Sequence, residues 1–127
     1  MPDKSVAEKL QFKPGRKVLL VSPPPEVDSL LGELPPDVIV QSSPQPPVDI
    51  IVLFTRHRQE LEAHLGSLRS LLAPQGMLWV IYYKGTARIK TDIHRDSINA
   101  YAQTLGLTGV AMISIDQDWS ALRLKVV

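Results

Sequence analysis

Four uninterrupted apolar runs stand out in the first two thirds of the chain. They are VLLV at 18–21, VIV at 38–40, IIVLF at 50–54 and MLWVIYY at 77–83. Polar residues do not alternate within them, and continuous runs of this kind are typical of parallel strands that are covered on both faces. The pattern therefore predicts a buried sheet whose strands run mostly parallel.

Three other segments have apolar residues at helical spacing. Their apolar positions are Val27, Leu30, Leu31 and Leu34 in the first, Leu61, Leu65, Leu68 and Leu72 in the second, and Ile93, Ile98, Tyr101, Ala102 and Leu105 in the third. We expect the second helix to stop before Pro74 and Gly76, because both residues interrupt helices. The third should run from about Asp92 to Leu105, where Gly106 is placed to end it.

The two ends of the chain carry further signals. Ser5 and Glu8 have the spacing of a capping box, so we expect a short helix over residues 5–10 that packs against the edge of the sheet. Near the other end, residues 109–116 and 119–127 flank a polar pair, which indicates a hairpin. Its last strand alternates apolar and polar residues, as an antiparallel strand with one wet face does.

This order of strands and helices predicts a single α/β domain over residues 1–127. We expect three layers, with a Rossmann-like, mostly parallel sheet that ends in an antiparallel β-hairpin. One connection is unusual, because only about eight residues separate the strand near 38–42 from the next, whereas a parallel crossover usually takes a dozen or more. Either residues 38–42 form a very short edge strand crossed by an extended proline-rich link, or that strand pairs differently.

The loop after the first strand has a composition that opposes nucleotide binding. In doubly wound sheets this loop usually holds a phosphate with the N–H groups of a glycine-rich turn. Here it reads SPPPE at 22–26, and its three prolines remove three N–H donors and fix three φ angles. Glu26 would also repel an anion at the start of the following helix. We therefore predict no nucleotide cradle in this loop.

Composition excludes several classes of function. Fourteen Lys and Arg against thirteen Asp and Glu leave a formal net charge of +1, so we predict no nucleic-acid binding and no membrane association. The chain has no cysteine, no apolar signal segment at its start and no run of about 18 apolar residues, which favours a cytoplasmic protein. His57, His64 and His94 lack the spacing of metal ligands, so we predict no metal site.

From Asp49 onward the chain resembles the second half of a class I S-adenosylmethionine-dependent methyltransferase. The matching features are DIIVLF, the amphipathic helix after it, LLAPQGMLWVIYY, a further helix and the closing hairpin. With the first strand included, the resemblance covers about two thirds of the chain. It implies a methyltransferase-like fold, while LLAPQG itself marks a turn from helix to strand and carries no chemistry.

The cofactor motifs of that superfamily have no counterpart here. A methyltransferase has a glycine-rich turn after its first strand, where this chain has SPPPE. It also has an acidic residue for the ribose hydroxyls after its second strand, where Gln41 and Ser42 follow Val40. There is no room for the helix, strand and helix that normally precede the DIIVLF strand. The resemblance thus implies a shortened fold with a degenerate cofactor site, and we predict no cofactor.

The whole chain also resembles a family of short bacterial proteins known only as a domain of unknown function. The resemblance rests on KLQFKPGRKVLLV, the early proline loop, WVIYYKG, IKTDIHRDSI and DWSALR. It strengthens the prediction of the fold and implies no activity.

Ligands of doubly wound sheets bind beyond the carboxyl ends of the strands. The candidate ligand-binding residues in the corresponding loops are Arg56, Lys84, Thr86, Lys90 and Trp119. Arg and Lys offer charge-assisted donors to an anion, and Trp offers a stacking face. We also expect Thr91 or Asp92 to cap the helix that follows. The alternative is that these loop residues are solvated, as they are on most such sheets.

Two functions from different classes remain open. The first is a binding or interaction module, for a small anionic ligand or a protein partner, that has lost the usual cofactor site; a structural subunit of a larger assembly would share its features. The alternative is an S-adenosylmethionine-binding methyltransferase with an atypical cofactor site. The sequence identifies no catalytic residue and leaves both enzyme activity and oligomeric state undecided.

Overall fold

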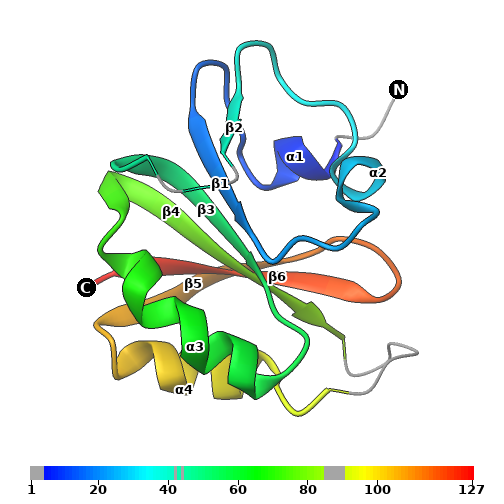
Figure 1. Ribbon diagram of the computed structural model, residues 1–127. Helices are drawn as coiled ribbons and strands as arrows, with labels where there is room; N and C mark the ends of the chain where they lie inside the picture. The colour runs from blue at the N-terminus through cyan, green and yellow to red at the C-terminus, as the bar shows by residue number, and fades with distance from the viewer. Residues whose placement is uncertain (1–4, 42, 44, 85–90) are drawn as a thin grey trace.

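The computed structural model describes residues 5–41, 43, 45–84 and 91–127. Its centre is a six-stranded sheet in the order β2-β1-β3-β4-β6-β5 (Figure 1). The strands are β1 (Lys17–Val21), β2 (Ile39–Gln41), β3 (Val48–Phe54), β4 (Leu72–Tyr83), β5 (Leu107–Ser114) and β6 (Trp119–Val126). The pairs among β1 to β4 are parallel, whereas β6 is antiparallel to both β4 and β5. The mostly parallel sheet with a closing hairpin is therefore confirmed.

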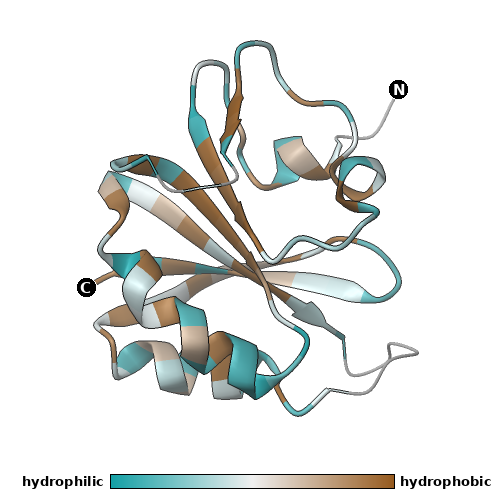
Figure 2. Cartoon of the chain, viewed as in Figure 1, coloured by the Kyte–Doolittle hydropathy of each residue, from teal (hydrophilic) through white to brown (hydrophobic). Residues whose placement is uncertain are grey.

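Helices cover the two faces of the sheet as separate layers (Figure 1). α1 (Val6–Lys9) and α2 (Val27–Leu31) lie on one face, while α3 (Arg58–Arg69) and α4 (Arg95–Gln103) lie on the other. The inner strands β1 and β3 are hydrophobic nearly throughout, whereas the helices carry hydrophilic residues on their outer sides (Figure 2). Among the described helices, none is long and apolar enough to cross a membrane.

The short helix α1 is held at both of its ends. Ser5 Oγ accepts a hydrogen bond from the Glu8 N–H at 3.2 Å and Glu8 Oε1 accepts one from the Ser5 N–H at 3.4 Å, which confirms the capping box. Beyond the helix, the Leu10 carbonyl accepts a hydrogen bond from Trp79 Nε1 at 3.0 Å. Because Ala7 and Leu10 are buried in one apolar cluster with Trp79, α1 covers a face of the sheet, and the prediction that it packs against the sheet edge is wrong.

The unusual connection follows the first of the two predicted alternatives. β2 is a three-residue edge strand that pairs in parallel with Lys17–Leu19, and residues 42–47 link it to β3. The link needs no helix, because β2 is so short that the chain has only a small distance to cover between the end of β2 and the start of β3. Asp49 stabilises the start of β1 from the neighbouring strand, since its Oδ2 accepts a hydrogen bond from the Lys17 N–H at 2.9 Å.

The second predicted helix ends earlier than its leucine spacing indicates. α3 stops at Arg69, and Leu72 already belongs to β4, where it pairs with Val48. The sequence pattern misplaced Leu72 because its distance from Leu68 suits a helix, while the pairing partner that draws it into the sheet lies in another part of the chain. β4 therefore runs through Pro74 and Gly76, with an irregular register on β3.

The last helix also begins later than predicted. α4 starts at Arg95, and Ser97 Oγ accepts a hydrogen bond from the His94 N–H at 2.9 Å in front of it. Asp92 is not its cap, because Asp92 Oδ1 instead accepts a hydrogen bond from the Arg58 N–H at 2.7 Å and so caps α3. Thr91 Oγ1 likewise donates to the Arg56 carbonyl, so the prediction that either residue caps α4 is wrong.

Candidate functional site

The loop between β1 and α2 offers few main-chain donors. Ser22, directly after β1, has a φ of +56°, a left-handed conformation that favours glycine. The three prolines at 23–25 have no N–H, and the Val27 N–H donates to the Pro24 carbonyl at 3.1 Å. Three of the main-chain amides that could cradle a phosphate at this position are therefore missing, and the Val27 N–H is already bonded.

The crevice at the topological switch point of the sheet is bridged by a side chain. From β1 the chain proceeds to β2 on one side of β1, whereas β3 and β4 lie on the other side. The switch point therefore lies between β1 and β3. Arg56, just after β3, places Nη2 3.3 Å from the Ser22 carbonyl oxygen and Nη1 3.0 Å from Glu60 Oε2. The Glu60 carboxylate also accepts a hydrogen bond from the Arg56 N–H at 2.9 Å. Arg56 thus joins the β1 and β3 loops with its charge already paired.

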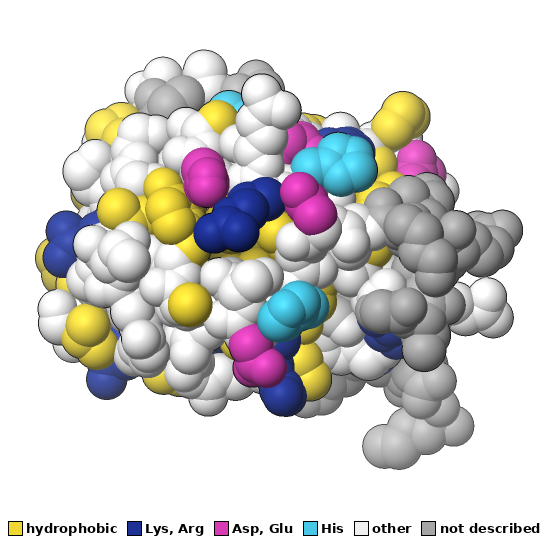
Figure 3. All heavy atoms as spheres, turned by 90° about the horizontal axis from the view of Figure 1, so that it is seen from below, with side chains coloured by type: hydrophobic (Ala, Val, Ile, Leu, Met, Phe, Trp, Pro, Cys, Tyr) yellow, Lys and Arg dark blue, Asp and Glu magenta, His cyan; other side chains and the backbone are white. Residues whose placement is uncertain are grey.

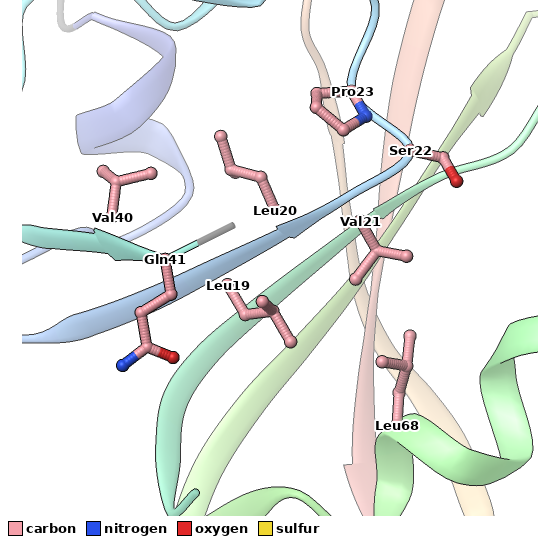
Figure 4. A pocket seen from close by; sticks show the side chains of 8 residues that line it. All are labelled: Leu19, Leu20, Val21, Ser22, Pro23, Val40, Gln41 and Leu68. Carbon is pink, nitrogen blue, oxygen red and sulfur yellow. The ribbon is translucent and has the colours of Figure 1, made fainter. Parts of the chain in front are cut away.

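An apolar cleft of about 440 Å³ lies at the carboxyl ends of β1 and β2 (Figure 4). It is lined by Leu19, Leu20, Val21, Ser22, Pro23, Val40, Gln41 and Leu68. Leu19, Val21 and Gln41 point to the same side of the sheet as Leu68 of α3, whereas Leu20 and Val40 point to the other side (Figure 4). Its volume lies within the range of small-molecule pockets, and none of the described residues that line it is charged.

Gln41 is the main polar side chain of this cleft. It is 9% exposed, and its Oε1 accepts a hydrogen bond from the Gln45 N–H at 3.1 Å, so its carbonyl group secures the link to β3. An amide at the end of β2 is neutral, whereas a carboxylate would carry a full charge. The cleft therefore combines apolar walls with one neutral hydrogen-bonding group.

The sequence did not identify this cleft. Its walls come from apolar residues of β1, β2 and α3 that the patterns assigned to the core. One signal could have found it: residues 42–47 are too few to place a helix over β1 and β2, so this part of the sheet is left thinly covered. Arg56 is the candidate that the structure brings nearest, because it contacts Ser22 at the cleft rim.

The other candidate ligand-binding residues lie farther along the same sheet edge. Lys84 Nζ donates to Ser114 Oγ at 2.6 Å and to the Asp116 carbonyl, so it joins β4 to the turn of the hairpin. Trp119 is 4% exposed, and its ring stacks on Tyr83 with 4.1 Å between centroids. Thr86 and Lys90 lie outside the described residues. Lys84 and Trp119 thus already have protein partners.

Tyr83 brings an aromatic hydroxyl to this edge of the sheet. Burial raises the pKa of Tyr83, and the positive charge of Arg56 opposes that rise. The residue therefore stays a neutral donor and acceptor at neutral pH. Its ring, together with Trp119 and Phe54, forms an aromatic cluster on the α1 side of the sheet.

Among the described residues, charged side chains form no patch of a single sign on the face that carries α3 and α4. Basic and acidic side chains lie beside one another there, with apolar patches between them (Figure 3). Arg58 pairs with Glu62 on α3, and Arg95 pairs with Asp96 on α4. Within the described residues, no three His, Asp or Glu side chains gather as metal ligands would.

Comparison with known proteins places the chain in a described family and fold. The family model "Protein of unknown function (DUF3052)" matches residues 7–127. No curated protein gives a significant match. The structure titled "DhpI-SAH complex structure" is 12% identical, with a TM-score of 0.65 over 95% of this chain and 82% of that chain. A SAM dependent methyltransferase from Aquifex aeolicus is 16% identical, with a TM-score of 0.64 over 94% and 87%.

A third structure, TrmN from Thermus thermophilus, is 15% identical and has a TM-score of 0.54, over 96% of this chain and 47% of that chain. At these identities the likeness shows the fold alone, which is methyltransferase-like. The fold raises the question of S-adenosylmethionine, and three features of this chain differ from the cofactor site expected for that fold. Three residues of the β1 loop are prolines without an N–H, Arg56 bridges the crevice, and a neutral Gln41 ends β2.

Proposed function

We infer that this chain, which belongs to the family described as protein of unknown function (DUF3052), acts as a non-catalytic binding module. It keeps a methyltransferase-like fold without the usual cofactor cradle, and it receives an apolar group of a protein partner in the cleft at the ends of β1 and β2. The observation that carries this proposal is the cleft itself, whose walls are almost entirely aliphatic and whose lining has no cation.

A protein partner fits the surroundings of the cleft better than a small ligand does. Ile39 and Val40, in the edge strand beside it, are 51% and 44% exposed. The apolar surface therefore continues from the cleft to the outer edge of the sheet, beyond what a small molecule would cover. Exposed apolar patches of this kind are typical of protein contacts.

A small anionic ligand finds less support at this edge. Arg56 is paired with Glu60, and Lys84 is bonded to Ser114 and to the Asp116 carbonyl. An anion would have to compete with these internal partners for either cation. Because the cleft contains no cationic side chain, it favours an uncharged group.

The alternative function is a methyltransferase with an atypical S-adenosylmethionine site. One observation favours it: the cleft lies at the carboxyl ends of two parallel strands, where ligands of such sheets bind. The Gln41 amide at the end of β2 could bond a ribose hydroxyl in place of a carboxylate. Only a direct binding measurement separates this alternative from the proposed module.

Two titrations test the proposal. Calorimetry with S-adenosylmethionine and S-adenosylhomocysteine should give flat traces, and saturable binding of either would refute the loss of the cofactor site. The neutral dye Nile red should bind the cleft with one-to-one stoichiometry and a blue-shifted emission. Val40→Asp should weaken that binding about tenfold, because it places a charge at the cleft wall.

The matched control is Val126→Asp. Val126 is 42% exposed, close to the 44% of Val40, and lies on β6 away from the cleft. This variant should bind the dye as the unchanged protein does. Equal binding by the unchanged protein and Val40→Asp would place the dye elsewhere and remove the support for the cleft as a binding site.

A further inference from the structure

The two edges of the sheet differ in how they are protected against pairing. β2, at one edge, has three residues, and prolines lie on both sides of it in the sequence. β5, at the other edge, has eight residues that read LTGVAMIS, with no proline and no charge. Proteins usually shield an edge strand by shortening it or by adding charges or proline. The β5 edge has neither protection, although the register irregularity between Gly109 and Ala111 interrupts it.

The stretch of β5 after this irregularity is exposed and apolar. Val110 and Met112 are each 48% exposed, and Ala111 between them is exposed as well. From Ala111 to Ser114 the register on β6 is continuous, so the outer side of this stretch forms a straight edge. An exposed edge of this length accepts an added strand through its unpaired main-chain groups.

A groove runs along the same edge between β5 and α4. Its volume is about 250 Å³, and it is lined by Arg95, Asp96, Asn99, Gly109, Ala111, Met112 and Leu122. Met112 borders it on the sheet side, where Tyr82 Oη donates a hydrogen bond to Met112 Sδ at 3.3 Å. The strand with the exposed apolar side chains thus also borders a groove that could receive such side chains.

We propose that β5 is a self-association surface, on which a second copy of this chain pairs antiparallel through residues 110–114 and extends the sheet across two molecules. This inference concerns a different edge from the proposed cleft and does not depend on it. A second copy is the favoured occupant because both complementary parts, the apolar side chains and the groove, lie on one element. A two-fold axis brings the same surface of both copies together, so each part meets its counterpart.

Symmetry restricts the register of this pairing. Residues directly opposite each other in a ladder have side chains on the same face, and successive residues alternate between faces. With the two-fold axis perpendicular to the sheet, one residue must therefore lie opposite its own copy, with the axis midway between the two. The proposed stretch 110–114 is centred on Met112, which places Met112 opposite its own copy, Ala111 opposite Ile113, and Val110 opposite Ser114.

Charge also permits the contact. β5 carries no charged residue that would face its own copy. The rim of the groove carries Arg95 and Asp96, which form an ion pair at 3.6 Å within the chain. Because the rim offers one charge of each sign, bringing two rims together adds no surplus of like charge. A partner whose strand carries several charges of one sign would find no net charge of the opposite sign on this rim.

The absence of cysteine from the chain allows a clean test by cross-linking. Met112→Cys places two thiols directly opposite each other, where antiparallel Cα atoms lie about 4.5–5.5 Å apart, within the reach of a disulfide. Under mild oxidation this variant should form the covalent dimer rapidly. Ser114→Cys is the control on the same strand, because its two thiols would be separated by four residues, roughly 14 Å. Equal cross-linking of the two variants would overturn the register.

Mass in solution provides the second measurement. Sedimentation of the unchanged protein should give twice the chain mass of 14.1 kDa at high concentration. Met112→Lys should raise the dissociation constant about tenfold or more, because like charges directly opposite in a ladder repel. Val40→Lys, a comparably exposed position on the other edge, should leave the dimer intact. A monomer mass for the unchanged protein over the whole concentration range would refute the proposal.

Discussion

Replacement of Ser22 by glycine should stabilise the fold. Ser22 is held at a φ of +56°, a conformation that costs a residue with a Cβ about 1–2 kcal/mol. Glycine removes that cost, but it also gives the unfolded chain more freedom, which opposes folding by about 0.4–1 kcal/mol. The net expectation for Ser22→Gly is a gain of about 0.5–1 kcal/mol in the free energy of unfolding, which corresponds to about 2–5 °C in Tm.

Replacement of a serine by glycine within a helix should instead lower the free energy of unfolding. Ser67 is an exposed residue within α3, and its Oγ donates to the His64 carbonyl at 3.1 Å. Glycine there costs helix propensity, so Ser67→Gly should lower the free energy of unfolding by about 0.5 kcal/mol. Denaturant titration followed by circular dichroism measures both variants, and the two changes should fall on opposite sides of the unchanged protein.

This experiment also bears on the cofactor site. The Ser22 carbonyl accepts from Arg56 through the main chain, so glycine keeps that contact. The prolines at 23–25 remain, and Ser22→Gly should therefore gain stability without gaining affinity for S-adenosylmethionine. A loss of stability equal to that of Ser67→Gly would show that Ser22 is not strained and would refute the reasoning.

Two further outcomes follow from buried aromatic residues. Trp79→Phe removes the N–H that donates to the Leu10 carbonyl and leaves this buried oxygen without that hydrogen bond. Denaturant titration should therefore show a fall of about 2–4 kcal/mol in the free energy of unfolding. A fall under about 1 kcal/mol would contradict the hydrogen bond between Trp79 and Leu10. Burial raises the pKa of Tyr82, so the hydroxyl of the folded protein keeps its proton at a pH at which the unfolded chain has already lost it. The contribution of this group to stability is full below pH about 10 and is lost as the pH rises through the raised pKa. In Tyr82→Phe the free energy of unfolding should therefore fall less steeply with pH in alkaline titrations.

Apolar continuity made the strands predictable. The runs at 50–54 and 77–83 became β3 and the second half of β4 because their residues are buried on both faces of the sheet. Caps were predictable only where both partners are close in sequence, as for Ser5 and Glu8. Asp92 caps a helix that begins 34 residues earlier, and no local pattern contains that contact.

The positions of the candidate ligand-binding residues in the fold were predictable, whereas their bonding partners and the cleft were not. The rule that ligand residues follow the carboxyl ends of strands placed Arg56, Lys84 and Trp119 along one edge of the sheet. Their partners Glu60, Ser114 and Tyr83 are set by tertiary packing, which local spacing does not report. The cleft forms because the short link from β2 to β3 leaves part of β1 and β2 uncovered. The residue types alone do not indicate this uncovered surface.

The bond between Trp79 and Leu10 has a consequence for how the protein is made. α1 has only four residues, too few to persist alone in water, so it needs the sheet as a support. On the ribosome α1 is synthesised before β4, so its docking surface is incomplete until residue 79 has emerged. α1 thus cannot dock fully until well after its own synthesis, and a nascent chain halted before β4 would leave it accessible to proteases and chaperones.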